Sequence, residues 1–134
     1  MSYVVDGDTV HVLDGRGSKI KVRVLGIDTP ETRDPRKPVQ CWGPEATQFA
    51  TATLLGQQVT LVTDASQDAR DRYGRVLAYL VLADGSNYSV LAASAGVARS
   101  YVYNRNPVSE HAAITAAEAD ARTGGRGLWG ACPT

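Results

Sequence analysis

Two carboxylates lie close together in the stretch Arg23–Glu31, which reads Arg-Val-Leu-Gly-Ile-Asp-Thr-Pro-Glu. Its alternating apolar residues predict a half-buried strand, and Asp28 and Glu31 follow where that strand ends. Pro30 fixes its own backbone and disfavours helix at Thr29, so we expect both acids on rigid backbone at the rim of the strand. This arrangement suits a functional site better than a core, although taken alone it could be a plain polar turn.

A third acid, Asp8, stands in the turn signal Asp6-Gly7-Asp8. If the first strands form a meander, Asp8 and Asp28 can share a pocket. Two carboxylates at close range repel and require a cation or a proton. Oxygen ligands without histidine or cysteine favour a hard cation such as Ca²⁺. An ordinary turn remains an equally simple interpretation of Asp-Gly-Asp.

Two arginines complete a set that could act on phosphate. Arg23 lies inside a predicted strand, where a basic residue is not expected on an apolar face, and Arg75 follows Tyr73-Gly74 at the start of another strand. The planar guanidinium binds phosphate through two parallel hydrogen bonds. Two arginines, a divalent cation and a carboxylate base suffice for attack on a phosphodiester. Each arginine could instead be a salt-bridged residue at a sheet edge.

Three tyrosines stand near basic residues: Tyr73, and the pair Tyr101 and Tyr103 between Arg99 and Arg105. Aromatic faces among basic groups suit base stacking combined with phosphate contact. Ordinary half-buried tyrosines are the competing interpretation.

The elements that must position these residues are three short strands, a helix, two strands and two helices. Alternating apolar runs between glycine-rich turns predict the strands. Proline, acidic residues and glycine mark the helix ends, and Ser109 is the expected N-cap of the last helix. Strands are expected at 4–5, 10–13, 20–27, 59–63 and 76–80, and helices at 43–54, 88–95 and from 109 to before 124. The order predicts an α+β fold in one domain, 1–134, with a partly closed, five-stranded antiparallel barrel of the OB-fold type and three α-helices.

The composition bounds the function classes. A chain of 134 residues is long enough to bury a core. The formal net charge is +0, with 14 basic and 14 acidic residues, which argues against a strongly basic nucleic-acid binder, although arginines cluster locally. No apolar run approaches the roughly 20 residues of a membrane span. We expect no signal peptide in this chain, because neither a basic nor an apolar segment follows Met1.

The two cysteines, Cys41 and Cys132, are too far apart for a C-x-x-C redox or zinc motif. They could be buried free thiols in a cytosolic protein or one disulfide in an exported protein. A disulfide would close a loop of roughly 90 residues and add about 4 kcal/mol on the chain-entropy account.

Several separated motifs, in the same order and with similar gaps, make this chain resemble the staphylococcal nuclease (thermonuclease) family over nearly its full length. The motifs are Val5-Asp6-Gly7-Asp8-Thr9-Val10, Val24 to Thr32, Gly43-Pro44-Glu45-Ala46, Asp71-Arg72-Tyr73-Gly74-Arg75, Leu77-Ala78-Tyr79, Tyr101-Val102-Tyr103 and Leu128-Trp129.

The resemblance implies a Ca²⁺-dependent, sugar-non-specific endo- and exonuclease that hydrolyses phosphodiester bonds of DNA and RNA to 3′-phosphate products. It implies that Asp8, Asp28 and the backbone carbonyl of Thr29 bind Ca²⁺, and that Glu31 is the candidate general base.

The same resemblance implies that Arg23 and Arg75 hold the scissile phosphate and stabilise the pentacoordinate state. The remaining substrate-binding residues that it implies are Arg72, Tyr73, Tyr101 and Tyr103.

This chain departs from the best-known members in its neutral charge and in its cysteines. Cys41 and Cys132 resemble a disulfide clip of some exported bacterial relatives, which favours the disulfide and a secreted or cell-envelope location. We expect a monomer without membrane contact or an obligate protein partner. Two alternatives are a non-catalytic nucleic-acid-binding OB-fold module and an OB-fold interaction domain with a structural Ca²⁺. The intact set of acids and arginines favours the enzyme.

Overall fold

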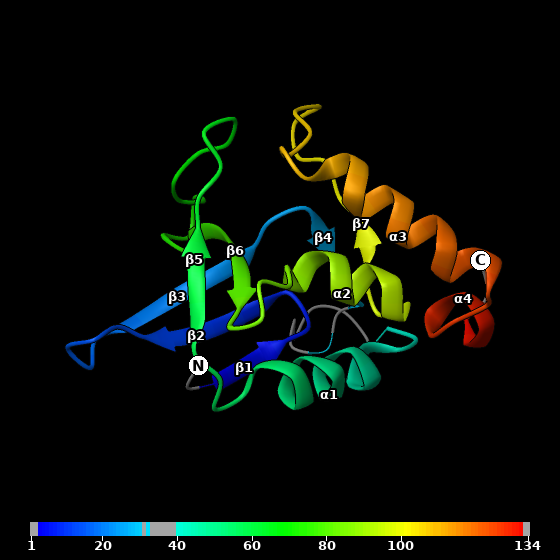
Figure 1. Ribbon diagram of the computed structural model, residues 1–134, viewed down its shortest axis with the longest axis horizontal. Coiled ribbons are helices and arrows are strands. Elements are labelled where there is room, and N and C mark those ends of the chain that lie inside the picture. The colour runs from blue at the N-terminus through cyan, green and yellow to red at the C-terminus, as the bar shows by residue number, and fades with distance from the viewer. Residues whose placement is uncertain (1–2, 31, 33–39, 133–134) are drawn as a thin grey trace.

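Five strands form one sheet in the order β1-β2-β3-β6-β5, on the left in Figure 1. The computed structural model describes residues 3–30, 32 and 40–132. β1 (Tyr3–Asp6), β2 (Thr9–Leu13) and β3 (Lys19–Val24) form the antiparallel meander that the alternating pattern predicts. β5 (Val59–Val62) pairs in antiparallel fashion with β6 (Val76–Leu82).

The predicted α+β fold with five main strands is confirmed, but the sheet differs from the expected antiparallel barrel. β3 and β6 are parallel, with Val22 opposite Val76 and Val24 opposite Ala78. The connection between them runs through β4, a helix and β5, and such a long crossover carries the chain back to the end of the sheet at which β3 began, so that β6 runs in the same direction. Among the described strands, β1 pairs only with β2 and β5 only with β6, so the sheet is not closed.

The third strand is shorter than predicted because the chain turns at Gly26, which has a φ of 83°. Residues Ile27–Asp28 form β4, which pairs with β7 (Arg99–Ser100) in a second, two-stranded sheet. A Cβ atom at Gly26 would lie 2.5 Å from Ile114 Cδ1, so the turn also requires glycine for packing. Strands of this length show no periodicity, and the sequence did not predict the second sheet.

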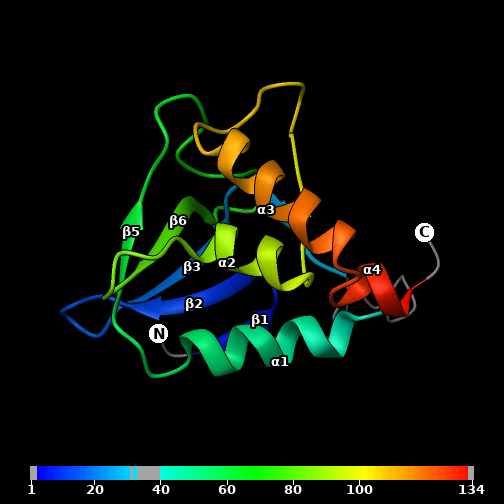
Figure 2. The same cartoon turned by 45° about the vertical axis from the view of Figure 1, so that its right-hand side comes forward.

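The three predicted helices are present as α1 (Gly43–Leu54), α2 (Tyr88–Ala95) and α3 (His111–Thr123), and a short α4 (Leu128–Ala131) follows them. Figure 2 shows α1 running beside β1 and α2 lying between α1 and α3. None of the described helices has the length and apolarity needed to cross a membrane.

The expectation that Ser109 caps α3 is wrong. The N-cap is Glu110, without a side-chain cap hydrogen bond. The Ser109 N–H donates instead to Asp64 Oδ2 at 2.6 Å, and its hydroxyl lies 3.4 Å from Tyr79 Oη. The charged Asp64 acceptor fixes the Ser109 backbone and the Ser109 hydroxyl contacts Tyr79, so the helix begins one residue later than predicted.

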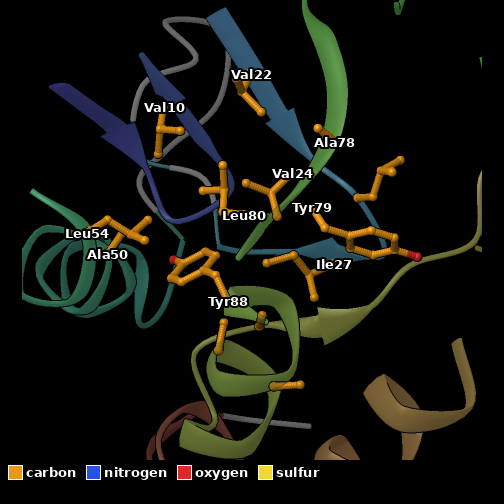
Figure 3. Close-up of a cluster of buried hydrophobic side chains, with 14 of the residues drawn as sticks. Val10, Val22, Val24, Ile27, Ala50, Leu54, Ala78, Tyr79, Leu80 and Tyr88 are labelled. Carbon is orange, nitrogen blue, oxygen red and sulfur yellow. The ribbon is translucent and has the colours of Figure 1, made fainter. Parts of the chain in front are cut away.

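The core lies between the sheet and the helices α1 and α2 (Figure 3). Val10, Val22 and Leu80 from the strands and Leu54 from α1 are fully buried. The Tyr88 side chain of α2 is also fully buried, and its hydroxyl donates to the Gly7 carbonyl oxygen at 2.6 Å. Burial raises the pKa of Tyr88 above its usual range, so the hydroxyl stays a donor. The core thereby holds the β1–β2 turn, which carries Asp8.

Candidate active site

The turn between β1 and β2 lies against the residues that follow β4. The Thr29 N–H donates to Asp8 Oδ2 at 2.9 Å, and the Val24 N–H donates to the Asp8 carbonyl oxygen at 2.9 Å. A Cβ atom at Gly7 would lie 2.7 Å from Thr29 Cγ2, so the two segments approach this closely only with glycine there. The Asp6-Gly7-Asp8 motif is therefore a turn that also fixes Asp8 beside Thr29.

Asp8 is a buried carboxylate with several donors around it. Thr9 Oγ1 donates to Asp8 Oδ1 at 3.1 Å, and Arg23 Nη2 lies 3.5 Å from Asp8 Oδ2. Burial acts to raise the pKa of Asp8, but the Arg23 guanidinium and the hydrogen bonds outweigh it and hold the pKa below its usual range. Asp8 is therefore ionised at neutral pH.

Arg23 is held on both sides by acceptors. Its Nη1 donates to the carbonyl oxygens of Val24 at 2.7 Å and Ile27 at 2.9 Å. Its Nη2 lies 3.5 Å from Asp8 Oδ2 and 3.6 Å from Asp28 Oδ1. The structure thus brings Asp8 and Asp28 to one guanidinium, and Arg23 forms the salt bridges that were its alternative interpretation.

Arg75 is oriented by Asp71, which the sequence singled out only as part of the motif Asp71-Arg72-Tyr73-Gly74-Arg75. Its Nε donates to Asp71 Oδ2 at 2.7 Å, and its backbone N–H donates to Asp71 Oδ1 at 3.0 Å. Its Nη1 reaches Thr9 Oγ1 at 3.4 Å, so the Thr9 hydroxyl links Arg75 to Asp8. Burial opposes ionisation of Asp71, but these Arg75 donors and the Tyr73 N–H lower its pKa. Asp71 accepts hydrogen bonds from the backbone N–H groups of Tyr73 and Arg75, two and four residues later in the chain. Aspartate is typical of turns for this reason, so the residue type alone could have indicated this role.

A cavity of about 620 Å³ opens beside these arginines. Its lining includes Leu25, Gly26 and Val108, together with residues of the β5–β6 connection and of the segment after β7. Six of the predicted site residues line it together: Arg23, Arg72, Tyr73, Arg75, Tyr101 and Tyr103. The cavity lining does not include Asp8, Asp28 or Thr29. The Asp8 and Asp28 carboxylates instead contact Arg23, which does line the cavity.

The arginines of this cavity lie over its tyrosine rings. Arg23 Cζ is 5.6 Å from the centre of the Tyr101 ring, and Arg72 and Arg75 are 4.9 and 5.4 Å from the centre of the Tyr73 ring. Tyr73 and Tyr103 are 66% and 63% exposed, which excludes the half-buried interpretation for them, while Tyr101 is 38% exposed. Exposed rings beside guanidinium groups leave an aromatic face available to a planar ligand.

Residues 103–106 form a tight hairpin that is held in place by a hydrogen bond from Gln67. Asn104 and Arg105 have φ values of 53° and 59°, and Tyr103 pairs with Asn106. Gln67 Nε2 donates to the Asn106 carbonyl oxygen at 2.8 Å, so the two walls of the cavity are joined.

Arg99, which the sequence places near the tyrosine pair, lies elsewhere. It is not part of the cavity lining, and its Cζ is 5.2 Å from the Trp129 ring.

The oxygen atoms near Asp8 fit a hard cation. Among the described residues no group of three or more His, Cys, Asp or Glu side chains forms a metal cluster, and Glu31 lies outside the described residues. The Thr29 hydroxyl is buried and has no hydrogen-bond partner within the described part of the chain. A buried, unpartnered oxygen on the residue whose N–H binds Asp8 suits Ca²⁺, which binds oxygen ligands and waters in a flexible geometry.

The predicted disulfide is confirmed. Cys41 and Cys132 are joined by an S–S bond of 2.05 Å, with their Cα atoms 5.9 Å apart.

Comparison with known proteins gives a consistent family. Residues 21–131 match the family described as "Staphylococcal nuclease homologue". The chain is 42% identical over 103 residues to a thermonuclease of Staphylococcus intermedius and 41% identical over 103 residues to one of Staphylococcus hyicus, covering 77% of this chain in each case. It spans only 59% of the length of these two relatives. An "Uncharacterized endonuclease" of Escherichia coli is 34% identical over 127 residues, covering 94% of this chain and 72% of that protein.

Proposed function

Because the chain belongs to the staphylococcal nuclease family, we propose that it is a Ca²⁺-dependent nuclease that hydrolyses phosphodiester bonds of DNA and RNA and leaves 3′-phosphate ends. The observation that carries this proposal is the position of Arg23. Its guanidinium lies within 3.6 Å of both the Asp8 and the Asp28 carboxylate, and it also lines the cavity that contains the exposed tyrosines.

Asp8, Asp28 and the Thr29 carbonyl oxygen would hold the cation. When bound, Ca²⁺ would act as a Lewis acid and stabilise negative charge on the phosphate. The lowered pKa of Asp8 keeps this carboxylate ionised and ready to bind a cation. The carboxylates of Asp8 and Asp28 lie beside Arg23, so cation and guanidinium would act on the same phosphate.

Arg23 and Arg75 would grip the scissile phosphate and stabilise the charge that develops on it. Hydrogen bonds to backbone carbonyls and to Asp71 orient the two guanidinium groups in advance. Such preorganised donors need little rearrangement during the reaction. Glu31 would remove the proton from the attacking water, as the resemblance implies.

The cavity walls would hold the rest of the substrate. Tyr101 and Tyr103 would stack on bases, and Arg72 and Tyr73 would contact a terminal phosphate. The contact of Arg72 Nη2 with the Tyr73 hydroxyl, at 2.8 Å, supports their acting as one unit.

The disulfide supports a location in an oxidising compartment, outside the cell or in the cell envelope. Residues 1–134 would act as one nuclease domain and as a monomer.

The experiment measures degradation of plasmid DNA and of RNA by the wild-type protein in Ca²⁺ and in a chelator. We expect degradation only in Ca²⁺. Glu31→Ser and Arg75→Ala should each lower kcat by about 10²–10³-fold, or about 2.7–4 kcal/mol, the scale of one lost transition-state interaction.

Arg16→Ala is the matched control, because Arg16 is exposed in the β2–β3 turn away from the cavity. Full activity in chelator, or variants as active as Arg16→Ala, would contradict the mechanism. Binding of nucleic acid without cleavage would identify a non-catalytic OB-fold module instead.

A further inference from the structure

The disulfide lies next to the candidate metal ligands. Both cysteines line a second cavity of about 250 Å³. Pro30, the residue that directly follows Thr29, lines the same cavity. Pro30 and Gln40 line the same cavity, so the chain returns to Cys41 close to the point where it leaves Thr29. The full lining is Pro30, Gln40, Cys41, Arg99, Leu128 and Cys132.

A second line of contacts runs from α4 to Asp28. The Trp129 ring has Arg99 Cζ at 5.2 Å and Arg122 Cζ at 5.0 Å from its centre. Arg99 is the strand partner of Asp28 in the β4–β7 pair. Trp129 therefore contacts the residue whose backbone is paired with a candidate ligand.

The helix α4 depends on attachments at both ends. At its start the Leu128 N–H donates to the Gly96 carbonyl oxygen at 2.9 Å, and a Cβ at Gly127 would lie 2.3 Å from that oxygen. Its C-cap is Cys132, which the disulfide joins to Cys41. A helix of four residues has little stability of its own, so the disulfide and the Trp129 contacts decide where α4 lies.

We propose that the Cys41–Cys132 disulfide and Trp129 are positioning elements for the candidate metal site, in addition to any contribution to stability. They hold β7 and Pro30 from one side, and these flank Asp28 and Thr29. A shift of the metal ligands by a fraction of an ångström weakens both cation binding and the alignment of the phosphate. The inference rests on the function proposed above.

The test compares the oxidised wild-type protein with the double variant Cys41→Ser/Cys132→Ser and with Trp129→Leu, which keeps the disulfide. The readouts are the Ca²⁺ Kd from titration calorimetry, and kcat and KM on a short single-stranded DNA, well below the unfolding temperature. Supporting residues around metal ligands typically change affinity by about 10–100-fold. We expect the Ca²⁺ Kd to rise and kcat to fall by about tenfold in each variant, with KM nearly unchanged because the tyrosine cavity is intact.

Leu54→Ala is the control for a purely structural effect. Leu54 is fully buried at the end of α1 and lines neither cavity. It should lower the unfolding temperature while leaving the Ca²⁺ Kd unchanged. If the double serine variant does not fold, Trp129→Leu decides the question.

The outcomes separate the two proposals. If the wild type binds Ca²⁺ and cleaves DNA, but the folded variants keep the wild-type Ca²⁺ Kd and kcat or change no more than Leu54→Ala, the positioning inference is overturned. If the wild type neither binds Ca²⁺ nor cleaves, the proposed function fails, and this inference fails with it.

Discussion

The side chain of Asp64 offers a sharp test of how the structure stabilises its site. The residue is buried, and it accepts four hydrogen bonds. Oδ1 accepts from the Ser66 N–H and hydroxyl at 2.9 and 2.7 Å. Oδ2 accepts from the Ser109 N–H at 2.6 Å and the Tyr79 hydroxyl at 3.2 Å. These bonds tie the β5–β6 connection to the start of α3.

Asp64→Asn keeps the shape of the side chain but turns one acceptor oxygen into an NH₂ donor. The hydroxyl groups of Ser66 and Tyr79 can rotate to adapt. The N–H groups of Ser66 and Ser109 cannot, and they bond to different oxygens, so one backbone donor must face the new NH₂. Hydrogen bonds to charged groups contribute about 1.5–3 kcal/mol each. We therefore expect the free energy of unfolding to fall by about 2–4 kcal/mol at pH 7.

The effect should depend on pH in a defined direction. Burial acts to raise the pKa of Asp64, but the hydrogen bonds from Ser109 and Ser66 outweigh it and hold the pKa well below its ordinary value of 3.8. A pKa that is lower in the folded state stabilises the protein above the unfolded pKa, and this stabilisation is lost as the pH falls towards the folded pKa. The difference between wild type and Asp64→Asn should thus be constant from pH 7 to about pH 5 and shrink below about pH 4.

Urea unfolding followed by tryptophan fluorescence at pH 7, 5 and 3 measures this difference. Asp84→Asn is the matched control, because Asp84 accepts from the Ser86 N–H at 2.9 Å in an exposed turn and should matter far less. An Asp64→Asn variant as stable as Asp84→Asn at pH 7, or a stability deficit that does not shrink at pH 3, would contradict a stabilising role of the Asp64 carboxylate.

Three further predictions concern the cavity and the turn beside it. Gly7→Ala should lower both the unfolding temperature and the Ca²⁺ affinity, because its Cβ would lie 2.7 Å from Thr29 Cγ2. Gly15→Ala is the control, because a Cβ there has no atom within 4 Å, and it should change neither value. Scanning calorimetry measures the unfolding temperature and titration calorimetry measures the Ca²⁺ affinity. Tyr103→Ala should raise KM for single-stranded DNA by about 5–150-fold, the scale of 1–3 kcal/mol for one stacked base, and Tyr103→Phe, which keeps the ring, should restore it. Arg72→Ala should reduce the slope of log(kcat/KM) against log[salt] by about 0.7 on single strands, and an unchanged slope would remove Arg72 from phosphate contact.

Local patterns were sufficient to predict most of the elements. Alternation of valine, leucine and isoleucine identified the main strands, and proline with acidic residues identified the start of α1. These signals are local because pleating and helical turns repeat within a few residues. The stretch from Arg23 to Thr29 likewise carries its own strand end and two candidate ligands, whatever the rest of the chain does.

Local sequence patterns did not predict which distant segments pair with each other. The parallel contact of β3 with β6 and the pairing of Asp28 with Arg99 depend on which edges remain open once the core has formed. The Ser109 N–H bonds to Asp64 and its hydroxyl contacts Tyr79, and these distant partners leave no trace in the local pattern that predicted a helix cap. For the cysteines, the residues alone left thiols and disulfide open, and the folded chain brings the two Cα atoms to 5.9 Å.

The amino-acid sequence contains every residue type that the site needs: carboxylates at rigid turns, arginines able to bind phosphate through two hydrogen bonds, and tyrosines among basic groups. Their common location follows from tertiary contacts. Asp8 and Asp28 meet because the Gly7 turn packs on Thr29, and Arg75 joins them through the Thr9 hydroxyl. The contacts of Thr29 with Asp8 and of Arg75 with Thr9 join groups 21 and 66 residues apart, and the burial of a shared core compensates for the entropy of bringing them together.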